Sequence, residues 1–166
     1  MIREILKYPD ARLAVECTEV CEITEEIRQL AEDMAETMYK EEGIGLAAPQ
    51  VGEHCRLIVV DVTGPEERKG LMKLVNPRLV NHEGEVETEE GCLSVLNYRS
   101  KVKRAEKVRL LAKDVDGKEV CMDADGLLAI CLQHEIDHLD GTLFIDKISR
   151  LKRTMYDGKV KKWLRK

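Results

Sequence analysis

The chain has few aromatic residues, no long apolar run and no Cys-x-x-Cys pair, and each absence excludes some classes of protein. Aromatic side chains make up only 4% of its 166 residues, so a core must be built mainly from aliphatic side chains. No segment approaches the roughly 18 apolar residues that a membrane-spanning helix needs. None of the six cysteines forms a Cys-x-x-Cys pair, the usual spacing of thiol-based redox and zinc sites. These absences favour an aliphatic domain that does not enter a membrane.

Signals for export or organelle import are also missing. The first residues, Met1–Pro9, lack the apolar stretch of a signal peptide, and their early acid argues against a transit peptide. We therefore expect a cytoplasmic protein with reduced cysteines. A hydrophobic content of 43% is enough for one core, so we expect one domain over residues 1–166 and a monomer.

Charge is spread unevenly along the chain. The last twenty residues, Lys147–Lys166, contain nine lysines or arginines and one acid, Asp157, which gives a local charge of +8. Because the whole chain carries −5, the other 146 residues carry −13. A basic segment on an acidic body suggests an anionic partner such as RNA, although a solvated terminal helix has the same composition.

Apolar periodicity predicts the order of the main elements. In chain order we expect a helix at about 25–41, a tight loop at 43–50, a buried strand at 56–62, a turn at 64–70, a strand over 73–80 with a kink or an edge position at Pro77, a hairpin of strands near 108–112 and 120–124, a helix at about 126–139 capped by Asp125, and a basic helix at about 147–166. The helix at 126–139 is apolar on most sides. The order predicts an α+β fold with mainly antiparallel strands packed around that central, buried helix.

The segment His134-Glu135-Ile136-Asp137-His138 has the HExxH pattern of metal-dependent hydrolases. Two histidines four positions apart lie on one helix face and can hold one metal ion. Glu135, between them, has the right length to accept a proton from a water molecule that the metal activates. The alternative is a surface helix that carries two histidines by chance, but a buried helix requires partners for such side chains.

A third metal ligand is expected in Glu90-Gly91-Cys92-Leu93-Ser94. A cysteine thiolate binds divalent transition metals strongly, and Cys92 with two histidines leaves a fourth tetrahedral position open for water. On its own, this short segment is weak evidence for a metal site.

Three segments together resemble the signature motifs of the peptide deformylase family, in the same order and with similar spacing. They are Gly43–Gln50, Glu90–Ser94 and Gln133–His138, and the likeness covers roughly residues 1–150. The resemblance implies that Cys92, His134 and His138 bind one divalent metal ion, Fe(II) in the typical case, with zinc, nickel or cobalt as alternatives. It also implies hydrolysis of the formyl group of N-formyl-methionyl nascent peptides, which releases formate.

The resemblance extends to the roles of individual residues. Glu135 accepts the proton and returns it to the leaving amine, while the Gln50 side chain and the Leu93 N–H stabilise the oxyanion. Four residues match positions that line the methionine pocket of the family, although ordinary core is an equal alternative for Leu127: Ile44, Leu127, Ile130 and Cys131. Gly45 lets the backbone lie beside the peptide, which pairs as an added strand. Arg99 contacts the peptide or is a surface charge, and Glu90 and Asp137 support the site rather than bind the metal.

One position departs from the family pattern. Relatives commonly carry proline where this chain has Leu96, and proline fixes φ, so we expect a looser segment beside the substrate groove. Two other functions are also compatible with a metal site at these residues, namely a zinc peptidase and a non-catalytic, metal-stabilised binding module. The resemblance further suggests that the basic segment 147–166 contacts the ribosome.

Overall fold

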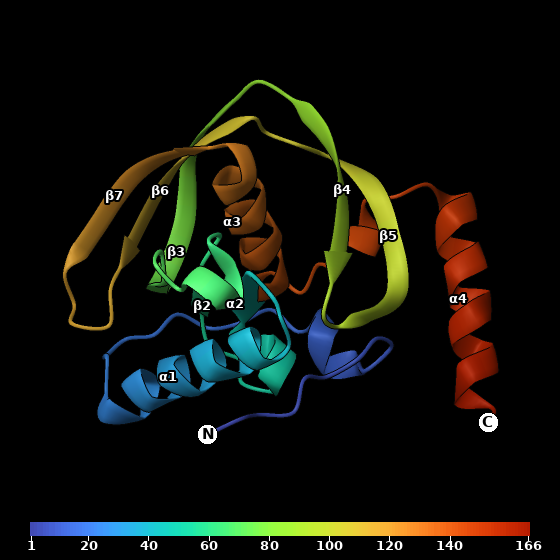
Figure 1. The fold of residues 1–166 in the computed structure, drawn as a ribbon, viewed down its shortest axis with the longest axis horizontal. Coiled ribbons are helices and arrows are strands. Elements are labelled where there is room, and N and C mark those ends of the chain that lie inside the picture. Colours follow the sequence, from blue (N-terminus) through green and yellow to red (C-terminus); the bar gives the residue numbers. More distant parts are fainter.

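Antiparallel pairing arranges the strands into two sheets in the computed structural model, which describes residues 1–166. The larger sheet has five strands in the order β1-β2-β3-β6-β7, and β4 pairs with β5 in a separate two-stranded sheet (Figure 1). The strands are β1 (Gly45–Ala47), β2 (Leu57–Val60), β3 (Met72–Glu83), β4 (Val86–Cys92), β5 (Val95–Arg104), β6 (Lys107–Lys113) and β7 (Glu119–Asp125). A mixed fold of helices and antiparallel strands is therefore confirmed.

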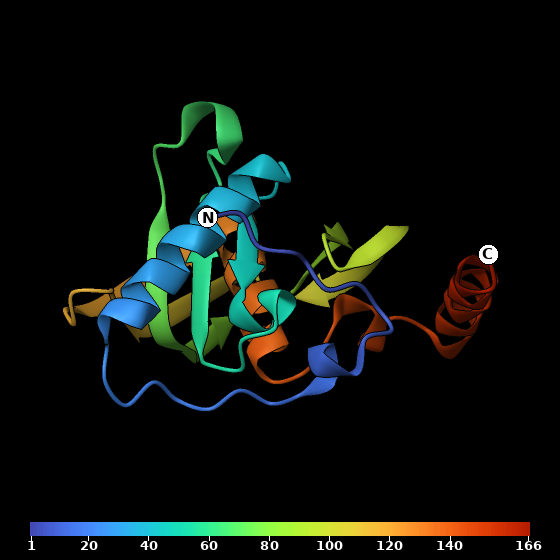
Figure 2. The same ribbon diagram turned by 90° about the horizontal axis from the view of Figure 1, so that it is seen from below.

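The two long helices of the body pack on opposite faces of the larger sheet (Figure 2). The α-helices are α1 (Glu25–Lys40), α2 (Gly64–Glu67), α3 (Gly126–Leu139) and α4 (Arg150–Leu164), and 3-10 turns span Ala11–Ala14, Ala48–Val51 and Phe144–Asp146. Thr24 caps α1 because its hydroxyl accepts a hydrogen bond from the Ile27 N–H. None of the helices combines the length and apolar character that crossing a lipid bilayer requires.

Strand β2 is buried on both faces, which explains its uninterrupted apolar sequence. Leu57 and Val59 pack in the cluster that includes α1, while Ile58 and Val60 pack in the cluster that includes α3. Successive side chains of a strand point to opposite faces, so a layer on each face requires an apolar residue at every position. The predicted buried strand is therefore confirmed.

The predicted kink in β3 is also present. The register between β3 and β6 shifts between Val75 and Arg78, on either side of Pro77. Asn76 lies in the left-handed region with a φ of 49°, and its side-chain amide forms two hydrogen bonds with the backbone of Val20. The Asn76 side chain thus forms hydrogen bonds at the bend, where the regular pairing of strand backbones is interrupted.

Several local predictions need correction. The segment at 43–50 contains the short strand β1 and the turn at Ala48–Val51, not only a loop, and α2 forms one helical turn within 64–70. Asp125 occupies the N-cap position of α3, but its side chain accepts no capping hydrogen bond. Strands β4 and β5 were not predicted, because several of their inward positions hold polar residues that hide the alternating pattern.

Helix α4 stands at one side of the molecule, next to the β4–β5 hairpin (Figures 1 and 2). It begins three residues after the predicted start, with Ser149 as its N-cap, and buries only Tyr156 and Val160. These two side chains join a small cluster with Val95 and Val102 of β5 and Leu143–Ile145. The basic residues of the helix remain mostly exposed.

Candidate metal centre

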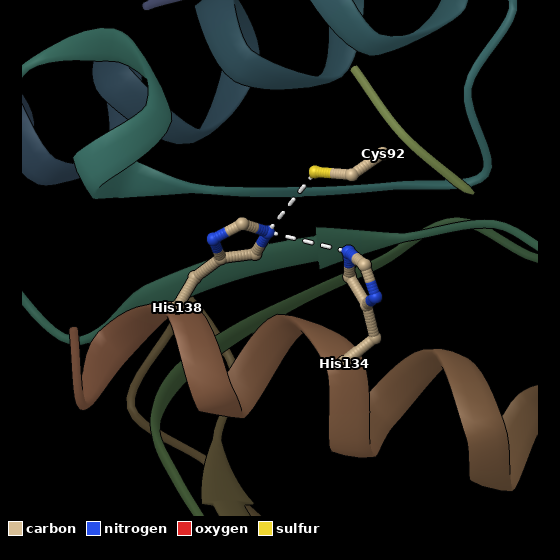
Figure 3. A group of neighbouring side chains, drawn as sticks. All are labelled: Cys92, His134 and His138. Atoms are coloured by element: carbon tan, nitrogen blue, oxygen red, sulfur yellow. Dashed lines mark hydrogen bonds between the residues drawn. The ribbon is translucent and has the colours of Figure 1, made fainter. Parts of the chain in front are cut away.

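Three potential metal ligands meet where α3 passes the end of β4. His134 and His138 lie one turn apart on α3, and Cys92 is the last residue of β4 (Figure 3). The Nε2 atoms of the histidines are 3.3 Å apart, and Cys92 Sγ is 3.4 Å from His138 Nε2. All three donor atoms lie within 4.8 Å of one another. The structure therefore brings together the three residues that the motifs single out.

These spacings suit a tetrahedral transition-metal ion. Ligand distances of about 2.05 Å for nitrogen and about 2.3 Å for sulfur place tetrahedral donors about 3.3 Å (N to N) and about 3.6 Å (N to S) apart. The measured separations of 3.3 and 3.4 Å agree with both values. Burial lowers the pKa of His138 well below its ordinary value, which keeps that ring neutral, as a ligand must be. The donor set thus fits one divalent ion and leaves a fourth position.

Glu90 fixes the orientation of the first histidine. Its carboxylate accepts a hydrogen bond of 2.9 Å from His134 Nδ1, which leaves Nε2 facing the other two donors. Burial works to raise the pKa of Glu90, but hydrogen bonds from Arg104 and His134 outweigh it and lower the pKa to about 2. A charged acceptor on one ring nitrogen increases the basicity of the other.

Arg104 completes this network, and the motifs gave no sign of it. The guanidinium group donates to both oxygens of Glu90, at 2.7 and 2.8 Å, and to Asp137 at 2.6 Å. Its side chain is only 3% exposed. The one signal in the sequence is the alternation on β5, where Ser100, Val102 and Arg104 face inward and two lysines between them face outward. An arginine at an inward position of a strand requires a buried partner.

Glu135 lies beside the three candidate metal ligands but forms no hydrogen bond with them. The residue is only 4% exposed. Oε1 of its carboxylate is 3.9 Å from His134 Nε2, and Oε2 has no hydrogen-bond partner. Burial raises the pKa of Glu135 to about 7. A carboxyl group with this pKa and a free oxygen can exchange protons near neutral pH.

Gln50 and Leu93 supply hydrogen-bond donors on the other side of the centre. The buried Gln50 amide donates to Ser94 Oγ at 3.0 Å and approaches Cys92 Sγ at 3.5 Å, while its oxygen accepts from the Ala47 N–H. These contacts fix the amide plane, so its NH₂ group points towards the centre. The Leu93 N–H donates to no backbone acceptor in its turn.

A cavity of about 670 Å³ opens onto the centre. It is lined by all the residues expected to contact substrate, together with the two expected oxyanion donors, Glu135 and two of the candidate metal ligands: Ile44, Gly45, Gln50, Cys92, Leu93, Arg99, Leu127, Ile130, Cys131, His134 and Glu135. Leu127 is 53% exposed and therefore belongs to the wall of the cavity rather than to the core. Arg99 lies 4.0 Å from Glu89, and both side chains are largely exposed.

Gly45 is required where the cavity meets the centre. A Cβ atom at this position would lie 2.7 Å from Glu135 Oε1 and 2.9 Å from Cys131 Sγ. Such distances are well below ordinary van der Waals contact, so only glycine allows β1 to run this close to α3. Burial raises the pKa of the Cys131 thiol, which therefore remains neutral beside the Glu135 carboxyl.

The family model and similar curated sequences point to the same protein family. The sequence model of the family Polypeptide deformylase matches residues 2–154. Peptide deformylase 2 of Nitrosomonas europaea is 51% identical over 165 residues, which cover 99% of this chain and 88% of that protein. The peptide deformylase of Thermodesulfovibrio yellowstonii is 50% identical over 160 residues, which cover 96% of this chain and 97% of that protein.

Solved structures agree with the sequence comparison. The crystal structure of a peptide deformylase from Legionella pneumophila superposes with a TM-score of 0.93 at 47% identity, over 99% of this chain and 96% of that chain. The peptide deformylase of Ehrlichia chaffeensis in complex with actinonin superposes with a TM-score of 0.92 at 41% identity, over 99% of both chains.

Proposed function

The chain belongs to the polypeptide deformylase family, and from this premise we propose how its own residues perform the reaction. The enzyme is a hydrolase that removes the formyl group from the N-terminal formyl-methionine of newly made polypeptides and releases formate. The observation that supports the assignment of residues is the meeting of Cys92, His134 and His138 beside the buried carboxyl group of Glu135. We also take residues 1–166 as one catalytic domain, with α3 as its central helix.

Cys92, His134 and His138 hold one divalent ion in this proposal, and Fe(II) is the ion we propose, with zinc, nickel or cobalt as substitutes. When bound, the ion supplies Lewis acidity that lowers the pKa of water and polarises a carbonyl oxygen. The chain's contribution is to fix the ligands before binding, through the hydrogen bond from His134 to Glu90 and the ion pair from Glu90 to Arg104.

Glu135 moves the proton. Its unpartnered oxygen accepts a proton from the attacking water as the water oxygen forms a bond to the formyl carbon. The carboxyl group then donates this proton to the peptide nitrogen as the carbon–nitrogen bond breaks, which leaves formate and a free N-terminal amine. A pKa raised to about 7 by burial suits both transfers at neutral pH.

Gln50 and Leu93 stabilise the negative charge that develops on the formyl oxygen. The Gln50 amide is held rigidly by Ser94 and Ala47, and the Leu93 N–H has no competing backbone acceptor. Donors fixed before the reaction need no reorganisation when the charge appears, which is the main advantage of such a site.

The peptide lies along β1, and the methionine side chain enters the apolar part of the cavity. The free edge of β1 offers backbone hydrogen bonds to an added strand, and Gly45 lets the two backbones approach closely. Ile44, Leu127, Ile130 and the neutral thiol of Cys131 surround the methionine, and Arg99 contacts the peptide beyond it. Backbone pairing explains how one site can accept varied sequences after the methionine.

The substitution Glu135→Gln tests the proton-transfer role. We expect kcat for formyl-Met-Ala-Ser to fall by about 10² to 10⁴, because the amide cannot accept the proton. Metal content should stay unchanged, since Glu135 is not a ligand. Glu87→Gln, on the exposed side of β4, serves as the matched control and should retain wild-type activity. An active Glu135→Gln enzyme would refute this role.

The two alternative functions gain no support from the relatives. A zinc peptidase should cleave unformylated Met-Ala-Ser, whereas this enzyme should release formate only from the formylated peptide. A non-catalytic, metal-stabilised binding module should release no formate at all. The same pair of peptides therefore separates all three functions in one assay.

We further propose that the enzyme works in the cytoplasm as a monomer and that α4 contacts the ribosome. The lysines of α4 are exposed, which suits binding to RNA phosphates. Because Tyr156 and Val160 belong to a core cluster, deleting the helix would also damage the body. Replacing Lys159, Lys161 and Lys162 by serine is a cleaner test. It should weaken ribosome cosedimentation in a salt-dependent way and leave cleavage of formyl-Met-Ala-Ser unchanged.

A further inference from the structure

One wall of the cavity is built from the start of β5, where this chain lacks the proline common among its relatives. Val95, Asn97, Tyr98 and Arg99 all line the cavity, and Leu96 stands where proline is expected. Asn97 has a φ of 55°, in the left-handed region, which asparagine adopts more readily than most residues other than glycine. Without a proline to fix φ at position 96, a restraint on this segment must come from elsewhere in the chain.

The restraint comes from α4. The Tyr156 hydroxyl donates a hydrogen bond of 2.9 Å to the Leu96 carbonyl, sixty positions earlier in the chain. The Tyr156 ring lies 4.8 Å from the Tyr98 ring, centroid to centroid, and Tyr156 is only 1% exposed. Tyr98 in turn stacks on Phe144, which stacks on the ring of His134. Tyr156 therefore contacts this segment twice, through a hydrogen bond to the Leu96 carbonyl and through a ring contact with Tyr98.

Helix α4 is itself anchored firmly enough to act as a support. The Tyr8 hydroxyl donates to Asp157 at 2.6 Å, and Arg153 donates to the Tyr8 hydroxyl at 3.1 Å and to Asp146 at 2.5 Å. The Tyr8 ring also stacks on Tyr156 at 6.0 Å. These contacts join the middle of α4 to the N-terminal segment and to the turn after α3, on both sides of Tyr156.

We propose that Tyr156 is a positioning residue for the formyl-peptide substrate, because its hydroxyl and ring hold the Leu96–Tyr98 wall of the cavity in the conformation that binds peptide. The proposal rests on the proposed function of the cavity. It assigns α4 a role in substrate binding in addition to any role in contacting a partner. Tyr156 does not touch the reacting atoms, so its effect is on peptide affinity and not on the chemical step.

The substitution Tyr156→Phe tests this role, since it removes the hydroxyl and keeps the ring. Loss of one hydrogen bond to a segment that must be ordered for binding should raise KM for formyl-Met-Ala-Ser about threefold to tenfold. The value of kcat should stay within about twofold of wild type, because the change leaves Glu135, Gln50 and the metal ligands in place. Amide hydrogen exchange of residues 93–99 should accelerate in the variant.

Tyr39→Phe is the matched control. Tyr39 is a buried tyrosine on α1 whose hydroxyl donates to Asp61 at 2.6 Å, away from the cavity. This variant loses a stronger, charge-assisted hydrogen bond and should lower Tm at least as much as Tyr156→Phe, but its KM and the exchange of residues 93–99 should match wild type. An equal rise of KM in both variants would overturn the proposal, because it would reveal only general destabilisation.

A second substitution provides rescue. In the double variant Tyr156→Phe, Leu96→Pro, proline fixes φ at position 96 and should return KM towards the wild-type value. A KM that stays as high as in Tyr156→Phe overturns the claim that Tyr156 acts by ordering this segment. A wild-type KM in Tyr156→Phe itself also overturns it. A wild-type chain that releases no formate would instead refute the proposed function, so the two failures are distinguishable.

Discussion

Replacing Arg104 by methionine should damage both the stability of the enzyme and its hold on metal. The substitution removes three charge-assisted hydrogen bonds, two to Glu90 and one to Asp137, at a site where the arginine is 3% exposed. It leaves the buried Glu90 carboxylate with His134 as its only partner. Removing one member of a buried pair typically costs about 3–5 kcal/mol, a large part of the total stability of a domain.

The effect on metal follows from the pKa of Glu90. Without the guanidinium group, burial raises this pKa with less opposition, and a protonated carboxyl is a poorer acceptor for the His134 Nδ1–H. Losing such an orienting partner usually lowers metal affinity about 10- to 100-fold. Urea denaturation in the presence of a chelator measures the first effect, and competition with a metal indicator measures the second.

Two further variants make the prediction sharp. Arg109→Met breaks the exposed pair with Asp123 on the neighbouring hairpin and should cost less than about 1 kcal/mol. The double variant Glu90→Gln, Arg104→Met removes both buried charges and should recover part of the stability lost in Arg104→Met. The reasoning fails if Arg104→Met costs no more than Arg109→Met, or if its metal affinity equals that of wild type.

Three other predictions follow from single sites. Gly45→Ala should lower kcat about 10- to 100-fold with little loss of metal, because the new methyl group collides with Glu135 and Cys131; steady-state assays and metal analysis check this. Cys92→Ser should retain less than half the metal of wild type after dialysis, because a hydroxyl is a much weaker ligand than a thiolate. Burial works to raise the pKa of Asp61, but hydrogen bonds from two hydroxyls and two backbone N–H groups lower it below 3.8. The stabilisation from this carboxylate is therefore present above pH 3.8 and lost as pH falls below it, so wild-type Tm should drop there more steeply than that of Asp61→Asn.

Local spacing was sufficient to predict the parts of the fold that depend on local periodicity. The helix at 25–40 has apolar residues at helical spacing, the apolar segment at 126–139 is too long for a typical strand, and β2 is apolar at every position. The proposed metal ligands also follow from short motifs, since two of them lie one helical turn apart. These features need no knowledge of which distant segments pack together.

Strands β4 and β5 escaped prediction for a physical reason. Their inward positions include Glu90, Ser100 and Arg104, so the alternation of apolar and polar residues that marks a strand is largely absent. Glu90 and Arg104 are tolerated inside because they pair with each other and with His134 and Asp137 of α3. Apart from the alternation along β5, the sequence gives no sign of the role of Arg104, because its partners Glu90 and Asp137 come from other elements of the chain.

At Leu96, too, a contact from a distant part of the chain changes what the local sequence predicts. The missing proline predicts a looser groove, because a proline typically stabilises a compatible site by about 0.4–1 kcal/mol through the unfolded state. The hydrogen bond from Tyr156 to the Leu96 carbonyl is worth about 0.5–1.5 kcal/mol by the usual measure, so one restraint can replace the other at similar strength. The two restraints differ in one respect, since proline acts within its own residue and Tyr156 acts only while α4 is docked. Order in the substrate groove of this enzyme therefore depends on the contacts that Tyr8 and Asp146 make with α4.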